Sequence, residues 1–315
     1  MSNYRLRPKP GVIKAGRIIQ TSISPIIIIN KPKTGKSPVA MSKIPEAQQV
    51  QRVIIRKPLK PPVKAQRPKI KGKPGRLRQR KEVEIGRYKK DVELLKNSGA
   101  GRILIMVACG PSILEVDLPK LKGHPLIDFM SINKPDPRLG TTKYWVFCDQ
   151  SQYTRNKDLF ESWQGTIINA WSVRARHQNQ VLVRNISGKG FSKNLVRGYH
   201  IGRSTTFANM QTAFWMNYDK VYIFGCDMSK STDLKKLHFY GTNPDVKPEI
   251  RVSRFQKEAE HYLIGANKMT PAECQKFTFC SSYNTWPFIE KFEKLDHKEA
   301  VDIILERAES MLKQK

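Results

Sequence analysis

Short apolar runs alternate with helical patterns after residue 82, and this alternation limits the folds that the chain can adopt. Apolar residues recur at helical spacing in 81–99, 205–218, 253–269 and 297–314. The apolar runs lie at residues 102–108, 128–133, 144–149, 165–170, 181–186, 220–227 and 276–282. Near-continuous apolar strands separated by helices are typical of parallel sheets that are buried on both faces. We therefore predict an α/β fold, with a Rossmann-like, mostly parallel sheet and helices on both faces.

The N-terminal part of the chain has a different composition, rich in Lys, Arg and Pro. Residues 1–81 contain 22 of the 57 Lys and Arg residues and one acid, Glu46, whereas the remainder contains 35 basic and 26 acidic residues. Such a segment buries too little apolar surface to offset the conformational entropy that ordering would cost. We predict a disordered basic arm over 1–82 and one α/β domain over 83–315.

Nucleic acid is the partner that the charge of the arm favours, because neutralising phosphates releases bound counterions. The stretch RPKIKGKPGRLRQRK, residues 67–81, interleaves basic residues with Gly and Pro, loosely like arms that lie in an A·T-rich minor groove. An anionic membrane surface and a merely solubilising tail are the alternatives. The predicted nucleic-acid-binding residues are Arg67, Lys69, Lys71, Lys73, Arg76 and Arg78.

The five cysteines show no Cys-x-x-Cys spacing, which predicts buried free thiols in a reducing compartment. No apolar segment follows Arg5, Arg7 and Lys9, so we expect no signal peptide. The longest apolar run in the arm, Ile26–Ile29, is far shorter than the roughly 18 residues that a membrane span needs. We expect a cytoplasmic protein, in the host cytoplasm if the chain is viral.

Polar residues follow several of the predicted strands, where open parallel sheets bind their ligands. After the first strand, Gly110 permits close approach of the backbone, and Ser112 suits a helix cap with free N–H groups for a phosphate. A plain tight turn is the alternative there, and Asp227 is alternatively a helix cap or a local turn former. The candidate nucleotide contacts are Cys109, Gly110, Pro111, Ser112, Asn133, Asp149, Arg203, Ser204, Thr205, Thr206, Asp227, Ser281 and Ser282.

His238 is the candidate general base, since it lies in a loop-like stretch, KKLHFYGTNP, and histidine titrates near neutral pH. The alternative is an ordinary surface histidine. The sequence contains no HExxH, no Cys/His cluster, no GxxxxGK[ST] and no Asp-x-Asp pair of the kind that holds a metal on a nucleotide sugar. We expect no metal and no cofactor other than a nucleotide-sugar co-substrate.

Taken in order, these motifs resemble those of the bacterial sialyltransferases that build lipooligosaccharide caps, and of related phage and bacterial proteins with a Gly-x-Gly-Pro-Ser-Leu start. The resemblance covers roughly residues 102–290. It rests on 108–112, Asn133, 147–150, 204–206, 218–227, 238–241 and 280–283. It implies a GT-A-like variant of the fold and a catalytic base, His238, in a His-x-Tyr-Gly segment that includes Tyr240.

The resemblance implies a metal-independent, inverting glycosyltransferase. Cys109 and Asp149 stand where the family has Asn, and the family's tyrosine pair at the leaving phosphate is not clearly present, so the donor differs from a CMP-linked sialic acid. The basic arm favours DNA as acceptor, for example a hydroxymethylated pyrimidine of phage DNA. The alternatives are a sialyltransferase-like enzyme of surface glycans and a non-catalytic nucleic-acid-binding or virion protein on a decayed transferase fold.

Overall fold

The computed structural model describes residues 86, 88–228, 238–240 and 248–314. The predicted arm and its six candidate nucleic-acid-binding residues, Arg67, Lys69, Lys71, Lys73, Arg76 and Arg78, lie outside the described residues. Residues 88–93 are helical and continue into turns, so the helix predicted over 81–99 ends earlier than the sequence indicated. Asn97 has a φ of 58°, a left-handed conformation that does not continue a helix.

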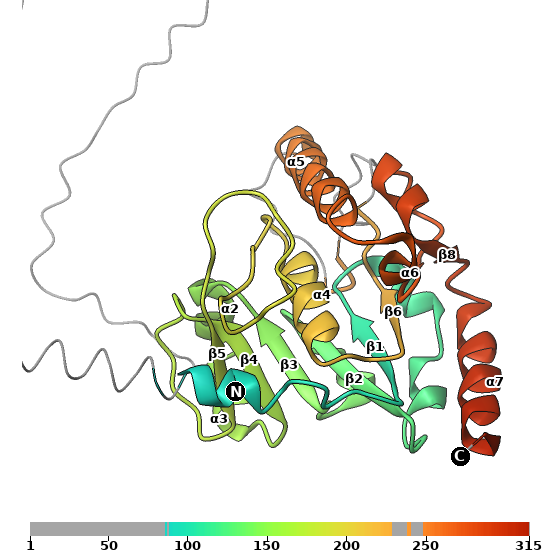
Figure 1. Ribbon diagram of the computed structural model, residues 1–315, viewed down its shortest axis with the longest axis horizontal. Coiled ribbons are helices and arrows are strands. Elements are labelled where there is room, and N and C mark those ends of the chain that lie inside the picture. The colour runs from blue at the N-terminus through green and yellow to red at the C-terminus, as the bar shows by residue number, and fades with distance from the viewer. Residues whose placement is uncertain (1–85, 87, 229–237, 241–247, 315) are drawn as a thin grey trace, which may run out of the picture. The chain divides into compact units, whose positions relative to one another are not determined.

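Within the described residues, eight strands form one parallel sheet in the order β5-β4-β3-β2-β1-β6-β7-β8 (Figure 1). The strands are β1 (Ile103–Val107), β2 (Ile127–Ile132), β3 (Tyr144–Phe147), β4 (Thr166–Ala170), β5 (Gln180–Val183), β6 (Lys220–Phe224), β7 (Phe277–Cys280) and β8 (Glu293–Leu295). The chain winds from β1 outward to β5 and then returns to the other side of β1. The direction of winding therefore reverses between β1 and β6, which makes this pair the topological switch point of the sheet.

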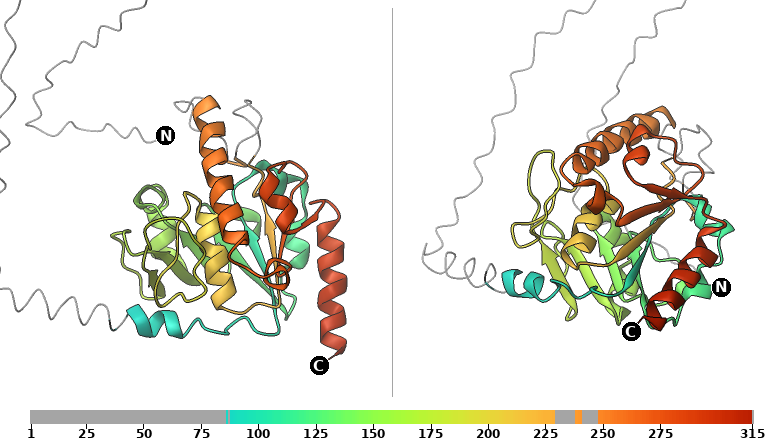
Figure 2. Two further views of the ribbon diagram at one scale, coloured as in Figure 1. Left: turned by 45° about the horizontal axis from the view of Figure 1, so that its top comes forward. Right: turned by 45° about the vertical axis from the view of Figure 1, so that its right-hand side comes forward.

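Helices cover both faces of the sheet, as Figures 1 and 2 show from three directions. The α-helices are α2 (Gln150–Arg155), α3 (Lys157–Ser162), α4 (Thr205–Trp215), α5 (Pro248–Ala266), α6 (Pro271–Cys274) and α7 (Ala300–Lys313). Short 3-10 turns add η1 (Pro111–Glu115), η2 (Leu118–Leu121), η3 (Pro137–Leu139) and η5 (Pro287–Lys291). The prediction of a Rossmann-like α/β sheet is confirmed.

The alternation of side chains along β1 explains why the sheet has two hydrophobic cores. Leu104 and Met106 pack in the core that contains residues of α4 and α5, whereas Ile103, Ile105 and Val107 pack in the core that contains residues of α7 and η2. All five residues of β1 are buried, as expected for a central strand covered on both faces. The sequence pattern of an uninterrupted apolar run therefore describes this strand correctly.

The five cysteines are free and buried, as predicted.

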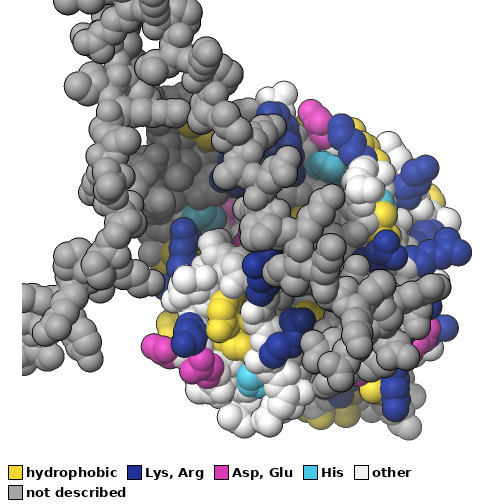
Figure 3. Space-filling view, turned by 90° about the vertical axis from the view of Figure 1, so that its left-hand side faces the viewer, with side chains coloured by type: hydrophobic (Ala, Val, Ile, Leu, Met, Phe, Trp, Pro, Cys, Tyr) yellow, Lys and Arg dark blue, Asp and Glu magenta, His cyan; other side chains and the backbone are white. Residues whose placement is uncertain are grey.

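Among the described helices, none is both long and apolar enough to cross a membrane. The face at the β5 end of the sheet carries Lys and Arg side chains with fewer Asp and Glu among them (Figure 3).

Candidate functional site

A cleft of about 320 Å³ opens at the carboxyl ends of the strands, next to the switch point between β1 and β6. Its described walls come from the turns after β1, β2, β3 and β6, from the start of α4, from α5 and from residues 238–240. The predicted site residues that line it are Cys109, Gly110, Asn133, Asp149, Arg203, Ser204, Thr205, Thr206, Asp227, His238 and Tyr240. The fold therefore brings into one cleft residues from widely separated parts of the sequence.

In the turn after β1, the amide groups of Gly110 and Ser112 are hydrogen-bonded within the protein. The amide of Gly110 donates to the carbonyl of Gly225 at 2.7 Å, and the amide of Ser112 donates to Asp227 Oδ2 at 2.9 Å. Ser112 is the second residue of η1, whose cap is Gly110, so the predicted cap role of Ser112 is wrong. Pro111 is the first residue of this turn, and neither Pro111 nor Ser112 lines the cleft.

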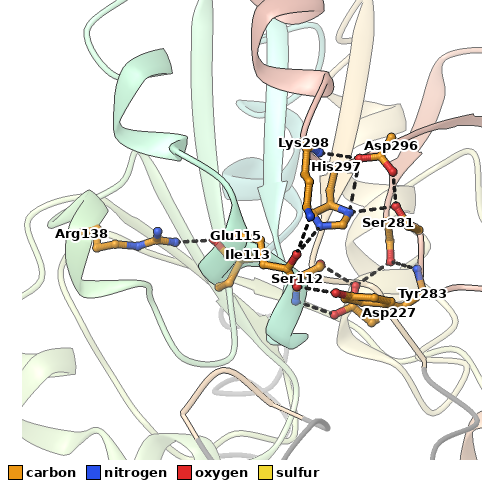
Figure 4. Close-up of polar contacts among 11 residues, drawn as sticks. Ser112, Ile113, Glu115, Arg138, Asp227, Ser281, Tyr283, Asp296, His297 and Lys298 are labelled. Atoms are coloured by element: carbon orange, nitrogen blue, oxygen red, sulfur yellow. Dashed lines mark hydrogen bonds and ion pairs between the residues drawn. The ribbon is translucent and has the colours of Figure 1, made fainter.

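Asp227 accepts hydrogen bonds from two neighbouring loops (Figure 4). The hydroxyl groups of Ser112 and Ser281 donate to its Oδ1 at 2.6 and 2.7 Å, in addition to the amide bond to Oδ2. Asp227 is 3% exposed, and both serines are fully buried. The donors lie in loops that are distant in the sequence, so these contacts connect separate loops and do not show the local turn-forming role. They occupy Ser112 and Ser281 with internal partners.

The approach of the two turns leaves no room for a side chain at Gly110. A Cβ atom there would lie 2.3 Å from Asp227 Oδ2 and 2.5 Å from the carbonyl oxygen of Gly225. The φ of Gly110 is −68°, which any residue adopts, so the requirement for glycine is steric. Gly110 thus keeps the turns after β1 and β6 in contact at the edge of the cleft.

Ser282 belongs to a second polar network, whose members Glu115, Asp296 and His297 are labelled in Figure 4. Its hydroxyl donates to Asp296 and lies 3.0 Å from Nδ1 of the buried His297, whose Nε2 lies 3.3 Å from Glu115 Oε2. The hydrogen bond from Tyr283 to Glu115 raises the pKa of this tyrosine to about 12. Ser282 does not line the cleft, so its predicted contact with a nucleotide lacks geometric support.

The segment that contains His238 is anchored to the turn after β1. The amide of Phe239 donates to the carbonyl of Cys109 at 2.9 Å, and the ring of His238 stacks on that of Tyr240 with centroids 5.1 Å apart. The Nζ of Lys134 lies 4.9 Å from the centroid of the same tyrosine ring. Burial raises the pKa of the Cys109 thiol to about 11, so this side chain is neutral at neutral pH.

Asn133 presents a buried acceptor at the cleft. It follows β2 with a φ of 60°, and its backbone is fixed by hydrogen bonds to Val146 and from Trp145 Nε1. Its Oδ1 is inaccessible to solvent and has no donor among the described residues. A buried acceptor without a partner is costly. Because this oxygen is closed to solvent, a ligand donor can reach it only if the side chain turns into the cleft.

The start of α4 forms another wall, as the sequence predicts. Ser204 is the N-cap of α4, and its hydroxyl accepts from the amide of Phe207 at 3.5 Å. Further residues that line the cleft were not predicted from the sequence, among them Gln152, Arg155, Arg254, Phe255 and Glu258. The helix α2 is too short to give a periodic signal, and the face that α5 turns to the cleft depends on packing that no local pattern encodes.

Among the described residues, no three His, Cys, Asp or Glu side chains are grouped as ligands of a metal ion would be. Comparisons with protein families, with curated proteins and with solved structures found no match to this chain.

Proposed function

We propose that the domain is a metal-independent glycosyltransferase that binds a nucleotide-sugar donor in the switch-point cleft. The observation that carries this proposal is the position of His238, which lines the cleft together with Asn133 and the start of α4. In parallel α/β sheets, nucleotides bind at the carboxyl ends of the strands at such a switch point. Asn133 lines this cleft, and its unpartnered Oδ1 gains a donor from a nucleobase if the side chain turns toward the ligand.

In the proposed reaction, His238 accepts the proton of an acceptor hydroxyl while its oxygen attacks the anomeric carbon of the donor sugar. The bond from this carbon to the phosphate oxygen breaks, and its electron pair leaves with the nucleotide. An in-line displacement inverts the anomeric centre. The GT-A-like character of the site rests on the motif resemblance alone.

The acceptor that we propose is a hydroxymethylated pyrimidine in DNA, modified in the cytoplasm of a phage host. The support for it is the excess of Lys and Arg in residues 1–81, which suits phosphate neutralisation. A target base must be presented to the cleft in the major groove or by flipping.

Thermal unfolding with a panel of nucleotides, CMP, CDP, UMP, UDP and GDP, tests the donor site. A ligand that binds only the folded state stabilises it by about 2.7 kcal/mol at a hundred times its Kd. We expect a rise in the unfolding midpoint with at least one nucleotide, unaffected by EDTA. Asn133→Ala is expected to lose this rise, whereas His238→Ala keeps it.

Transfer is then measured with nucleotide sugars and hydroxymethylated duplex DNA, by the gain in mass of the DNA. We expect His238→Ala to lose transfer, and the matched control His177→Ala, which lies away from the cleft, to retain it. No shift of the midpoint with any nucleotide at millimolar concentration would contradict the transferase and leave a basic binding protein. Transfer to surface-glycan hydroxyls alone would contradict the DNA acceptor.

A further inference from the structure

Three arginines that come from three different elements line the cleft. Arg155 is the last residue of α2, Arg203 lies in the turn before α4, and Arg254 belongs to α5. All three side chains are exposed. In the described part of the chain, none of them donates a hydrogen bond or forms an ion pair through its guanidinium. Guanidinium groups that lack carboxylate partners are well suited to phosphate oxygens, which they bind in pairs of parallel hydrogen bonds.

The aspartates of the cleft do not neutralise these arginines by direct contact. Asp227 already accepts three hydrogen bonds from Ser112 and Ser281, and no ion pair joins the arginines to Asp149 in the residues that the structure describes. A third acid, Glu258, also lines the cleft, but no ion pair joins it to any of the three arginines among the described residues.

The start of α4 adds uncharged donors beside Arg203. Thr206 lines the cleft and is 6% exposed, yet its hydroxyl makes no hydrogen bond to any described residue. Arg203 itself has a φ of 63°, in the left-handed region that side chains other than glycine adopt rarely. The turn thus holds a cation, an unpartnered hydroxyl and the amino end of an 11-residue helix at one wall of the cleft.

We infer that this wall, formed by Arg155, Arg203, Thr206 and Arg254, binds a diphosphate. The donor is accordingly a nucleoside diphosphate sugar and not a nucleoside monophosphate sugar. This inference rests on the proposed function and specifies its substrate class. When the bond between the sugar and the β-phosphate oxygen breaks, the electron pair stays on that oxygen and the negative charge of the diphosphate increases. Three guanidinium groups stabilise this added charge where it develops.

Calorimetric titration of the full chain tests the inference with matched pairs of ligands, CMP and CDP, UMP and UDP, GMP and GDP, and AMP and ADP, and with inorganic pyrophosphate. For the nucleoside that binds, we expect the diphosphate to bind at least about tenfold more tightly than the monophosphate. Arg155→Gln, Arg203→Gln and Arg254→Gln are each expected to reduce this ratio several-fold. The matched control Arg197→Gln, an exposed arginine outside the cleft, is expected to leave the ratio unchanged.

The outcomes separate this inference from the proposed function. Equal affinity for a monophosphate and its diphosphate would overturn the diphosphate site and leave the nucleotide site standing. The diphosphate site would also be overturned if the three arginine variants of the cleft showed the same ratio of diphosphate affinity to monophosphate affinity as the control Arg197→Gln. If no nucleotide and no pyrophosphate binds, both proposals fail. A fourth outcome is that pyrophosphate binds tightly, that the cleft variants lose this binding, and that no nucleotide binds. This outcome would support the diphosphate wall and contradict the nucleotide-sugar donor.

Discussion

At the scale of single residues, Asp227 and Gly110 define the edge of the cleft. Asp227 connects the turns after β1, β6 and β7 through Ser112 and Ser281, and Gly110 permits the close contact between the first two turns. The sequence indicated that Gly110 permits close approach of the backbone, but it did not show that Asp227 joins distant loops, and both residues were predicted as nucleotide contacts. A motif fixes the residue type, but whether its polar atoms face a ligand or another loop depends on the packing of distant strands.

We predict that Gly110→Ala destabilises the protein by about 2–3 kcal/mol, because the new Cβ overlaps backbone and carboxylate atoms that cannot move independently. The expected drop in the unfolding midpoint is about 5–10 °C, measured by circular dichroism. Gly86→Ala is the control, since a Cβ atom at Gly86 would meet no other atom within 4 Å, and it is expected to leave the midpoint unchanged or raise it. An unaltered midpoint for Gly110→Ala would contradict the steric argument.

At the scale of elements, the sequence predicted the seven longer strands and three of the longer helices, because their apolar patterns are strong. It missed β8, which has the sequence Glu-Lys-Leu and no apolar run, and it missed α2, α3 and α6, which are too short for a helical period. The order of the strands is a property of long-range pairing and was not predictable from local patterns. Consequently the switch point became visible only in the structure, although the sequence had already predicted contacts at the carboxyl ends of the strands.

The amino ends of the central strands are joined by Asp128, at the opposite edge from the cleft. Asp128 is 5% exposed and accepts hydrogen bonds from Arg102 at 2.6 and 2.8 Å, from Lys143 at 2.7 Å and from Tyr218 at 2.8 Å. Burial alone would raise the pKa of this carboxyl group, but the hydrogen bonds from these three residues lower it below 3.8. The ionised carboxylate therefore links β2 to residues that precede β1, β3 and β6.

We predict that Asp128→Asn costs about 2–4 kcal/mol at neutral pH, because it leaves the cations without their buried partner. A carboxyl group whose folded pKa is depressed stabilises the protein above its unfolded pKa, about 3.9, and loses this contribution as the pH falls through the folded value. The difference in unfolding free energy between wild type and Asp128→Asn is expected to be constant above about pH 5 and to shrink below about pH 4. Urea titrations from about pH 2.5 to about pH 7 measure it, with Asp158→Asn as an exposed control. A difference that does not change with pH would contradict this assignment.

The helix α7 offers a matched pair of neighbours for testing how it covers the sheet. Ile304 is fully buried in the core shared with η2, whereas Ile303 is 38% exposed. We predict that Ile304→Ala lowers the unfolding free energy by about 2–4 kcal/mol and Ile303→Ala by less than about 1 kcal/mol. Equal losses in chemical denaturation would mean that α7 presents a different face to the sheet.

At the scale of the whole molecule, charge is divided unequally between the two predicted parts. The whole chain carries +30, of which the 22 basic residues and single acid of residues 1–81 supply the larger share. Binding that depends on such charges weakens as salt concentration rises, whereas binding in the cleft depends on specific side chains. The salt-dependent binding by the basic residues and the binding in the cleft can therefore be measured separately on the intact protein.

We predict that changing the six candidate arm residues to Gln, in the full chain, weakens duplex DNA binding and makes it less sensitive to salt. These residues are Arg67, Lys69, Lys71, Lys73, Arg76 and Arg78. If each neutralises one phosphate, the slope of log K against log salt decreases in magnitude by about 5. Fluorescence anisotropy at a series of salt concentrations measures the slope, and an unchanged unfolding midpoint checks that the domain is intact. A slope equal to that of the wild type would show that these six residues do not contact the phosphates.

The central position of β1 has a consequence for synthesis on the ribosome. Ile103 of β1 pairs with Lys220 of β6, so the inner edge of β1 stays without its final neighbour until the chain has grown far past β5. At about 5–20 residues per second, this interval lasts roughly ten seconds. During that time the nascent half-sheet exposes an apolar, hydrogen-bonding edge of the kind that promotes aggregation. A chaperone that shields this edge until β6 emerges is therefore expected to favour correct folding, whereas slower translation between β1 and β6 is expected to prolong the exposure.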